Sequence, residues 1–201
     1  MLNSLTKLFH RLLTFHAFRI LVVAVVAMST ACAASSDVYR DETMDFGSVR
    51  TVAVMPFVNL SKDQLAGERV RDVFTTLLLA SGALYAVPPG EVARGVAAAG
   101  LAYATTPTPD EIMKLGKMIK VDAVITGVIR EYGEIRSGTA TADVISVSMQ
   151  MVETQTGKIV WNASSTKGGI GMKDRLFGGG GKPLNHLTEE CLNEIITKLF
   201  E

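Results

Sequence analysis

The sequence predicts an α/β fold. Residues 51–57 (TVAVMPF) form a short apolar run of the kind found in buried strands, and residues 121–129 (VDAVITGVI) form a second. Residues 141–163 alternate between apolar and polar side chains on either side of a tight turn, the pattern of a hairpin with one buried face. Segments with apolar residues at helical spacing separate and follow these strands. We therefore expect helices packed against a sheet.

Length and charge fit one folded domain with a removable N-terminal segment. The chain has 201 residues, of which 48% are hydrophobic and 20% charged, so it carries enough apolar surface for a core. The first 31 residues contain three basic side chains and no acid, which leaves 17 basic and 20 acidic side chains in the remainder. A net charge of −3 in that remainder argues against nucleic acid as a partner.

The N-terminus has the order of charge and hydrophobicity of a signal peptide. Residues 1–19 are basic and free of acids, and they lead into the wholly apolar residues 20–28. This run is shorter than the roughly 20 apolar residues that a membrane-spanning helix needs. We therefore predict that residues 1–31 are a signal peptide that is removed on export.

The residues at the end of this segment resemble the lipobox of bacterial lipoproteins. Thr30, Ala31 and Cys32 match the lipobox, whereas Ser29 stands where leucine is usual. The resemblance implies cleavage between Ala31 and Cys32 and lipid attachment to Cys32, which makes a membrane the first partner. A Ser-Thr-Ala sequence also suits an ordinary signal peptidase, so a soluble periplasmic protein is the alternative.

The residues after Cys32 predict where the domain lies. Ala33 rather than aspartate follows the cysteine, and in the enterobacterial sorting rule that this resembles, such a residue favours the periplasmic face of the outer membrane. Residues 33–47 are small, polar and acidic without a sustained period, as in a tether. We accordingly assign residues 32–48 to a lipidated N-terminus and tether and residues 49–201 to the folded domain.

The second cysteine, Cys191, lies within a helical pattern. In an oxidising compartment a disulfide with Cys32 is the competing use of the pair, and lipid on Cys32 excludes it. Cys191 is then most simply a small buried apolar residue.

Capping patterns mark two helix starts. Ser61-Lys62-Asp63-Gln64 is the pattern of a capping box and predicts a helix that begins there. Thr108-Pro109-Asp110-Glu111 combines an N-cap, a proline at the first helical position and a capping-box glutamate. A further amphipathic helix follows the glycine-rich segment 168–181, and its predicted inner side consists of Leu187, Cys191, Leu192, Ile195, Ile196 and Leu199.

Two strand assignments follow from alternation. The apolar strand at 121–129 continues into the more polar residues 130–135 (REYGEI). Residues 141–152 place Ile145, Val147, Met149 and Met151 on one predicted face and serine or glutamine on the other. The turn at residues 154–158 has Gly157 where a positive φ is needed.

The glycine-rich segment invites comparison with a phosphate-binding loop. GGGGK at residues 178–182 lacks the required glycine at position 176, and Pro183 replaces the serine or threonine after the lysine. A glycine loop without a ligand is the preferred interpretation. Residues 173–175 (Lys-Asp-Arg) are interpreted as a solvated charge cluster, with contact to a partner or a lipid headgroup as the alternative.

No set of residues predicts a catalytic, cofactor or metal site. Outside the signal segment His186 is the single histidine, and it lies at a helix start. Asp63, Glu68 and Asp72 are separated by arginines and suit a charged helix surface. Asp122 precedes a buried strand and Glu131 follows it, positions at which acids commonly end strands. We therefore predict no enzyme activity and no small-molecule substrate.

Residues 50–166 resemble the CsgG-type and LpoB-type periplasmic lipoprotein domain. The most specific matches are the pattern from Leu115-Gly116-Lys117 to Gly127 and the hairpin from Val152 to Trp161. The resemblance implies a three-layer α/β/α sandwich on a mixed sheet, related to the N-terminal domain of TolB. The C-terminal amphipathic helix completes the predicted fold.

The functions known for the two types frame the expectation. CsgG-type members form an oligomeric secretion channel with two long inserted hairpins per subunit. In this chain the corresponding insertion points are residues 133–141 and 154–158. Neither segment is long enough to hold two additional strands, because a spanning strand takes about 9 to 11 residues. LpoB-type members use a long tether to reach a peptidoglycan synthase, whereas the tether here spans at most about 50 Å.

We therefore predict a non-enzymatic, periplasm-facing membrane lipoprotein. It acts in the assembly, stabilisation or regulation of a cell-envelope machine, through an envelope protein partner or self-association. A CsgG-like secretion-channel or secretion-accessory subunit is the alternative. A hydrolase or ligand-binding domain is a third possibility. The sequence argues against it, because no set of polar residues is predicted to converge on one site.

Overall fold

The computed structural model describes residues 38–138, 140–170 and 181–201. Within them no helix is both long and apolar enough to cross a membrane. The elements, in chain order, are β1 (Val38–Arg40), the 3-10 helix η1 (Phe46–Ser48), β2 (Thr51–Val54), β3 (Val58–Asn59), α2 (Ala66–Ala80), β4 (Tyr85–Ala86), α3 (Pro89–Ala99), α4 (Pro109–Ile119), β5 (Ala123–Ser137), β6 (Ala140–Glu153), β7 (Ile159–Gly168) and α6 (Leu184–Phe200).

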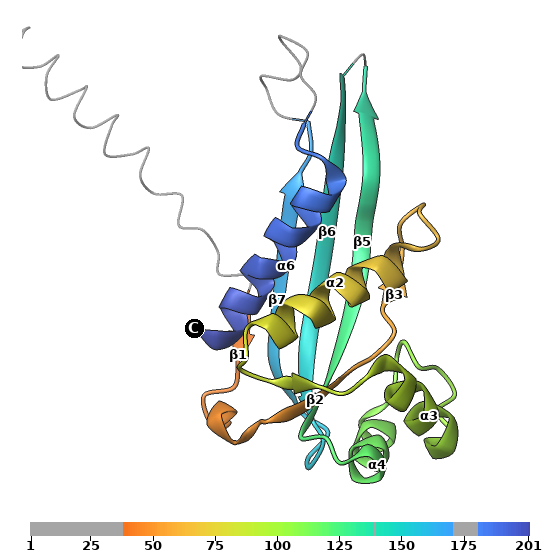
Figure 1. The fold of residues 1–201 in the computed structure, drawn as a ribbon, viewed down its shortest axis with the longest axis vertical. Coiled ribbons are helices and arrows are strands. Elements are labelled where there is room, and N and C mark those ends of the chain that lie inside the picture. Colours follow the sequence, from red (N-terminus) through yellow and green to blue (C-terminus); the bar gives the residue numbers. More distant parts are fainter. Residues whose placement is uncertain (1–37, 139, 171–180) are drawn as a thin grey trace, which may run out of the picture. The chain divides into compact units, whose positions relative to one another are not determined.

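The strands form one seven-stranded mixed sheet with the order β1-β7-β6-β5-β2-β4, and β3 pairs with β5 beyond the end of β2. Strand β2 pairs in parallel with β4 and with β5, and β3 pairs in parallel with β5. The pairs β5–β6, β6–β7 and β7–β1 are antiparallel. Figure 1 shows β5 and β6 as the longest strands, with their distal ends extending beyond α2.

Helices cover both faces of the sheet. Ile125 belongs to the core that α2 and α6 share with the sheet, and its neighbour Val124 belongs to the smaller core under α3 and α4. Successive residues of a strand point to opposite faces, so the two cores lie on opposite sides of β5. This confirms the predicted α/β sandwich on a mixed sheet.

The β6–β7 hairpin agrees with its prediction. Gly157 has a φ of +70°, and the residues of β6 predicted to be buried are 0–1% exposed. The other face is less exposed than the alternation predicts, because Ser146 is buried and Ser148 and Gln150 are half-buried. The C-terminal helix is also confirmed, because all six residues of its predicted inner side are buried.

The two predicted helix starts have different outcomes. At α4 the capping box is confirmed: Thr108 Oγ1 accepts from the Glu111 amide at 3.4 Å, and Glu111 Oε2 accepts from the Thr108 amide at 2.8 Å. The capping box at Ser61 is wrong. The helix α2 begins at Ala66, and the Ser61 hydroxyl instead donates to Asn59 Oδ1 at 2.7 Å, because residues 60–65 continue as a loop from β3.

The folded domain also begins earlier than predicted. Strand β1 pairs with β7 from Val38 opposite Ala163 to Arg40 opposite Trp161, within residues that the sequence assigned to the tether. The guanidinium of Arg40 donates to the carbonyl of Leu199 at 2.8 Å and so helps to close the end of α6. The boundary of the folded domain therefore lies at or before Val38. The sequence does not reveal this boundary, because a three-residue edge strand is too short to show periodicity.

Candidate interaction surface

Cys32, the residue predicted to carry the lipid, lies outside the described part of the chain. So do Ala31, which precedes the predicted cleavage site, and the charged residues 173–175 of the glycine-rich segment. Their assignments stay predictions.

The remaining charged candidates lie apart from one another. His186 is exposed on α6, where its Nε2 lies 3.3 Å from Glu190 Oε1, which also contacts Lys182 Nζ at 2.5 Å. The hydrogen bond from Lys182 holds the pKa of the Glu190 carboxyl below its usual range. Asp63, in the loop before α2, pairs with Arg69 at 3.0 Å. Within residues 38–138, 140–170 and 181–201, no three histidine, cysteine or acidic side chains converge as metal ligands.

Asp122 has a structural task at the start of the sheet. Its Oδ2 accepts hydrogen bonds from the amides of Arg50 and Thr51 at 2.9 and 2.8 Å, and from Thr51 Oγ1 at 2.9 Å. Burial alone would raise the pKa of Asp122, but these donors outweigh it and hold the pKa below the usual range. The carboxylate therefore fixes the entry of β2 beside β5.

Cys191 is buried against β7. Burial raises the pKa of its thiol to about 11, and its Sγ lies 3.5 Å from the carbonyl of Ser165. A thiol with such a pKa stays protonated near neutral pH and is a poor nucleophile. This agrees with the interpretation of Cys191 as a small core residue.

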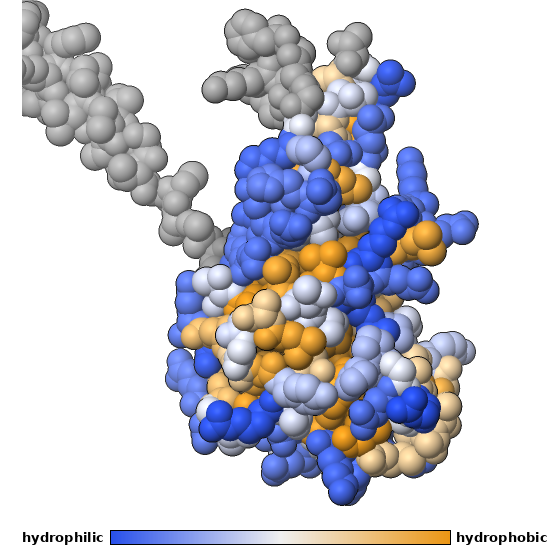
Figure 2. Space-filling model, in the orientation of Figure 1, coloured by the Kyte–Doolittle hydropathy of each residue, from blue (hydrophilic) through white to orange (hydrophobic). Residues whose placement is uncertain are grey.

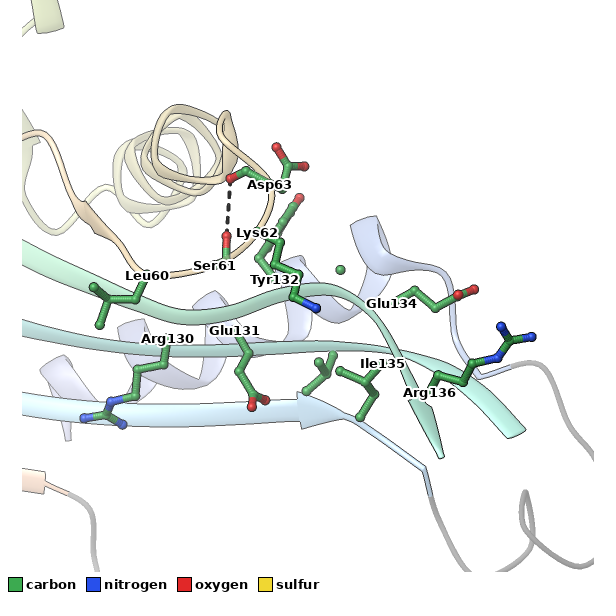
Figure 3. A pocket seen from close by; sticks show the side chains of 12 residues that line it. Leu60, Ser61, Lys62, Asp63, Arg130, Glu131, Tyr132, Glu134, Ile135 and Arg136 are labelled. Atoms are coloured by element: carbon green, nitrogen blue, oxygen red, sulfur yellow. Dashed lines mark hydrogen bonds between the residues drawn. The ribbon is translucent and has the colours of Figure 1, made fainter. Parts of the chain in front are cut away.

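A groove of about 710 Å³ runs along the distal part of β5. Figure 3 shows its two walls: the loop from Leu60 to Asp63, and β5 from Arg130 to Arg136. Tyr132 points to the side of β5 that carries α2, whereas Ile135 points to the other side. The groove therefore wraps around the edge of the strand.

Among the described residues, no strand lies beside that edge. On the side facing β2 and β3, the last ladder contact of β5 is the hydrogen bond from the Leu60 amide to the Ile129 carbonyl, at 2.9 Å. Beyond it, within the described residues, Arg130 lies in a bulge of β5, and Glu131–Ser137 pairs with β6 alone. We call residues 130–137 the open β5 edge. An unpaired strand edge offers a row of backbone donors and acceptors to another chain.

The open β5 edge carries charges of both signs. Glu131, Glu134 and Arg136 are exposed, and Ile135 exposes 36% of its surface between the last two. Charged residues on a strand edge disfavour pairing with arbitrary strands. Pairing with a partner of complementary charge is still possible.

The sequence contained part of this information. The sequence predicts residues 130–135 as an extension of the strand and places Glu131 after its apolar part, but it does not reveal the free edge. The feature of the sequence that indicates a free edge is a difference in length: the predicted strand at 121–135 is longer than the one at 51–57. Only the pairing of β3, which stops at Asn59, shows where the edge becomes free.

A second surface of note lies over α2. Figure 2 shows apolar residues gathered along this helix, in contrast to the hydrophilic surface around the N-terminal part of α6. Leu65 and Leu79, at the two ends of α2, expose 51% and 44% of their surface, and Leu60 exposes 66%. This surface borders the groove at Leu60.

Comparison with solved structures shows the same fold. A dodecamer of a PelC variant from Paraburkholderia phytofirmans matches with a TM-score of 0.56 and 16% identity, over 82% of this chain and 98% of that chain. The lipoprotein GNA1162 from Neisseria meningitidis matches with a TM-score of 0.54 and 19% identity, over 75% of this chain and 97% of that one. The LpoB C-terminal domain from Salmonella enterica is less similar, with a TM-score of 0.47, 14% identity, and coverage of 71% and 91%.

Comparison of sequences gives the family. No curated protein matches the chain. A family model with the description "Putative lipoprotein GNA1162-like" matches residues 43–180, which include both sequence patterns that carried the lipoprotein resemblance. The chain therefore belongs to the GNA1162-like lipoprotein family.

Proposed function

We propose that this protein is a non-enzymatic lipoprotein, anchored through Cys32 to the periplasmic face of the outer membrane. Its domain assembles, stabilises or regulates a cell-envelope machine through protein–protein contacts. The observation that carries the proposal is the open β5 edge beside a groove, a surface that can bind an extended segment of another chain through backbone hydrogen bonds.

Further observations support it. Membership of a lipoprotein family supports the anchor, together with the charge and apolar order of residues 1–32. The positions of His186, Asp122 and Cys191 support a non-enzymatic role, since each has a surface or structural environment.

The anchor is tested by labelling cells with a clickable palmitate. We expect labelling of the wild type and of Cys191→Ser, and complete loss of label in Cys32→Ser, because only the cysteine at the cleavage site can be acylated. Label retained by Cys32→Ser, or a wild type that never takes label, would refute lipidation at Cys32.

Membrane placement is tested by density-gradient separation of inner and outer membranes. The wild type should fractionate with the outer membrane, and Ala33→Asp should shift to the inner membrane if the sorting rule applies. A wild type found in the soluble periplasmic fraction would support simple secretion instead.

The binding role is tested by capture from detergent-solubilised envelopes with the full-length lipidated chain. Leu60→Lys places a charge on the groove wall, whereas Arg94→Ala changes an exposed residue of α3 that does not line the groove. A partner that binds the groove should be captured by the wild type and by Arg94→Ala but not by Leu60→Lys. Equal capture by all three would show that the groove is not the binding surface.

The alternative function is an oligomeric subunit of the CsgG kind, and the dodecamer formed by PelC, which shares the fold, favours self-association. Size-exclusion chromatography with light scattering on the full chain in detergent separates the two functions. A stable assembly of many subunits favours the alternative, and a monomer or dimer favours the first proposal.

A further inference from the structure

The end of the open β5 edge is complementary to itself. Glu134, Ile135 and Arg136 place an apolar side chain between an acid and a base, and in the described residues none of them takes part in an ion pair. In a strand, Glu134 and Arg136 point to one face and Ile135 to the other. Such a sequence can pair with a second copy of itself around a two-fold axis.

We propose that two copies of this chain pair in antiparallel fashion through their open β5 edges, with the two-fold axis at Ile135. Ile135 then faces Ile135 of the second copy, and Glu134 faces Arg136 on both sides of the axis. Gly133 faces Ser137, a pair without bulk to obstruct the approach. Opposite charges directly across two strands stabilise the pair, and an exposed apolar residue becomes covered.

Charge selects this register over its neighbours. An axis at Glu134 brings two glutamates face to face, and an axis at Arg136 brings two arginines face to face. An axis at Gly133 places Glu134 opposite Tyr132 and Ile135 opposite Glu131, so neither Glu134 nor Arg136 meets an opposite charge. Because like charges across strands are destabilising, the axis at Ile135 is the register in which both charged residues meet an opposite charge.

The groove accommodates this arrangement. In the paired register, the end of the second copy's β5 lies beside Tyr132 and Gly133, where the groove is open and where a Cβ on Gly133 would meet no atom within 4 Å. The side chains of Leu60 and Lys62 on the facing wall can then contact the hairpin end of the second copy. The groove is thus the place where one copy receives the hairpin of the other.

This inference rests on the proposed function, which requires a protein partner, and names that partner as a second copy. Ile135→Cys in the full chain, expressed in the bacterial envelope, tests it directly. Residues opposite each other in antiparallel strands bring their Cβ atoms to about 4.5–5.5 Å, near the range that a disulfide needs. We expect a covalent dimer on a non-reducing gel under mild oxidation.

The matched control is Glu131→Cys, an exposed residue of the same strand. Two copies of residue 131 lie about eight positions apart in the proposed register, roughly 26 Å along the strands, so this variant should stay monomeric. Cys191 adds little background because burial raises its pKa to about 11. The wild-type chain gives the background of the native cysteines.

Charge reversal tests the register independently. Glu134→Arg or Arg136→Glu alone should weaken the dimer by about tenfold in affinity, measured as the yield of the Ile135→Cys cross-link, because each creates two like-charged pairs. The double variant Glu134→Arg/Arg136→Glu exchanges the charges and should restore the yield. A double variant as weak as the single ones overturns the proposed pairing.

The remaining outcomes are also decisive. Absence of the Ile135→Cys dimer in a folded chain, or equal cross-linking through Glu131→Cys, refutes the two-fold arrangement. If the monomeric chain nevertheless captures another envelope protein through the groove, the proposed function stands and this inference falls. Conversely, a cross-linked dimer that carries no lipid and captures no envelope protein leaves the pairing intact and removes the proposed function.

Discussion

Gly116 on α4 lies directly against the side chain of Thr154 at the end of β6, so that a Cβ on Gly116 would overlap the threonine. Thr154 Oγ1 in turn donates to the carbonyls of Val121 and Asp122 at 2.7 and 2.9 Å. One close contact therefore joins α4, the start of β5 and the β6–β7 turn. It also gives a physical reason for the two separate sequence patterns, around Gly116 and around Thr154, to occur together.

Gly116→Ala should destabilise the domain. The added methyl must displace Thr154 or α4, and overpacking of this kind costs about 1–3 kcal/mol, more than the helix propensity that alanine gains. Urea unfolding measures the loss. Gly90→Ala on α3 is the control, because a Cβ there would meet nothing closer than Arg94 at 3.8 Å. Equal stability of the two variants would contradict the assigned contact.

Thr108→Ala and Ser61→Ala should differ although both change a predicted N-cap. Thr108 caps α4, and its loss should lower the free energy of unfolding by about 1 kcal/mol. Ser61 precedes α2 without capping it, so Ser61→Ala should change stability by less than about 0.5 kcal/mol. The two variants are compared by their denaturant midpoints at equal m-values. A larger loss of stability for Ser61→Ala would show that the hydrogen bond from Ser61 to Asn59 contributes more to stability than expected.

Glu194 should give the domain an acid-sensitive contribution to stability. Burial alone would raise its pKa, but Lys167 and Lys198, whose Nζ atoms contact its two carboxylate oxygens, lower the pKa from 4.5 to about 2. Because the folded-state pKa is depressed, the contribution is complete above the ordinary pKa and is lost as the pH falls from 4.5 towards 2.

The measurement is the difference in unfolding free energy between wild type and Glu194→Gln across this pH range. The difference should be largest above the ordinary carboxyl pKa and should shrink in acid. Glu189→Gln, an exposed neighbour on the same helix, should follow the wild-type profile. A constant difference for Glu194→Gln would mean that the carboxylate contributes through packing rather than charge.

A chain that begins at residue 49 should be less stable than one that begins at residue 37. The shorter chain lacks β1 and therefore loses the pairing of Val38–Arg40 with β7 and the hydrogen bond from Arg40 to the Leu199 carbonyl. We expect a melting temperature lower by at least about 4 °C. Coincident thermal transitions would instead restore the domain boundary predicted from the sequence.

Local chemistry explains which predictions succeeded. The β6–β7 hairpin was predictable because alternation and the positive φ of Gly157 are properties of neighbouring residues. The α4 capping box was predictable because Thr108 and Glu111 complete it within one turn. At Ser61 the same pattern failed, since Asn59 competes for the hydroxyl and holds the segment in a loop.

The sequence alone determined the α/β class, the faces of β6 and α6, and the export signal with its candidate lipid site, because these depend on short-range periodicity and on composition. Only the tertiary structure placed β1 beside β7 and left β5 unpaired beyond Ile129 on its β3 side. Both facts depend on where a distant strand ends, since a backbone edge is free or paired only in relation to its neighbour. The candidate interaction surface therefore belongs to the fold, although Glu134, Ile135 and Arg136 supply its charge pattern.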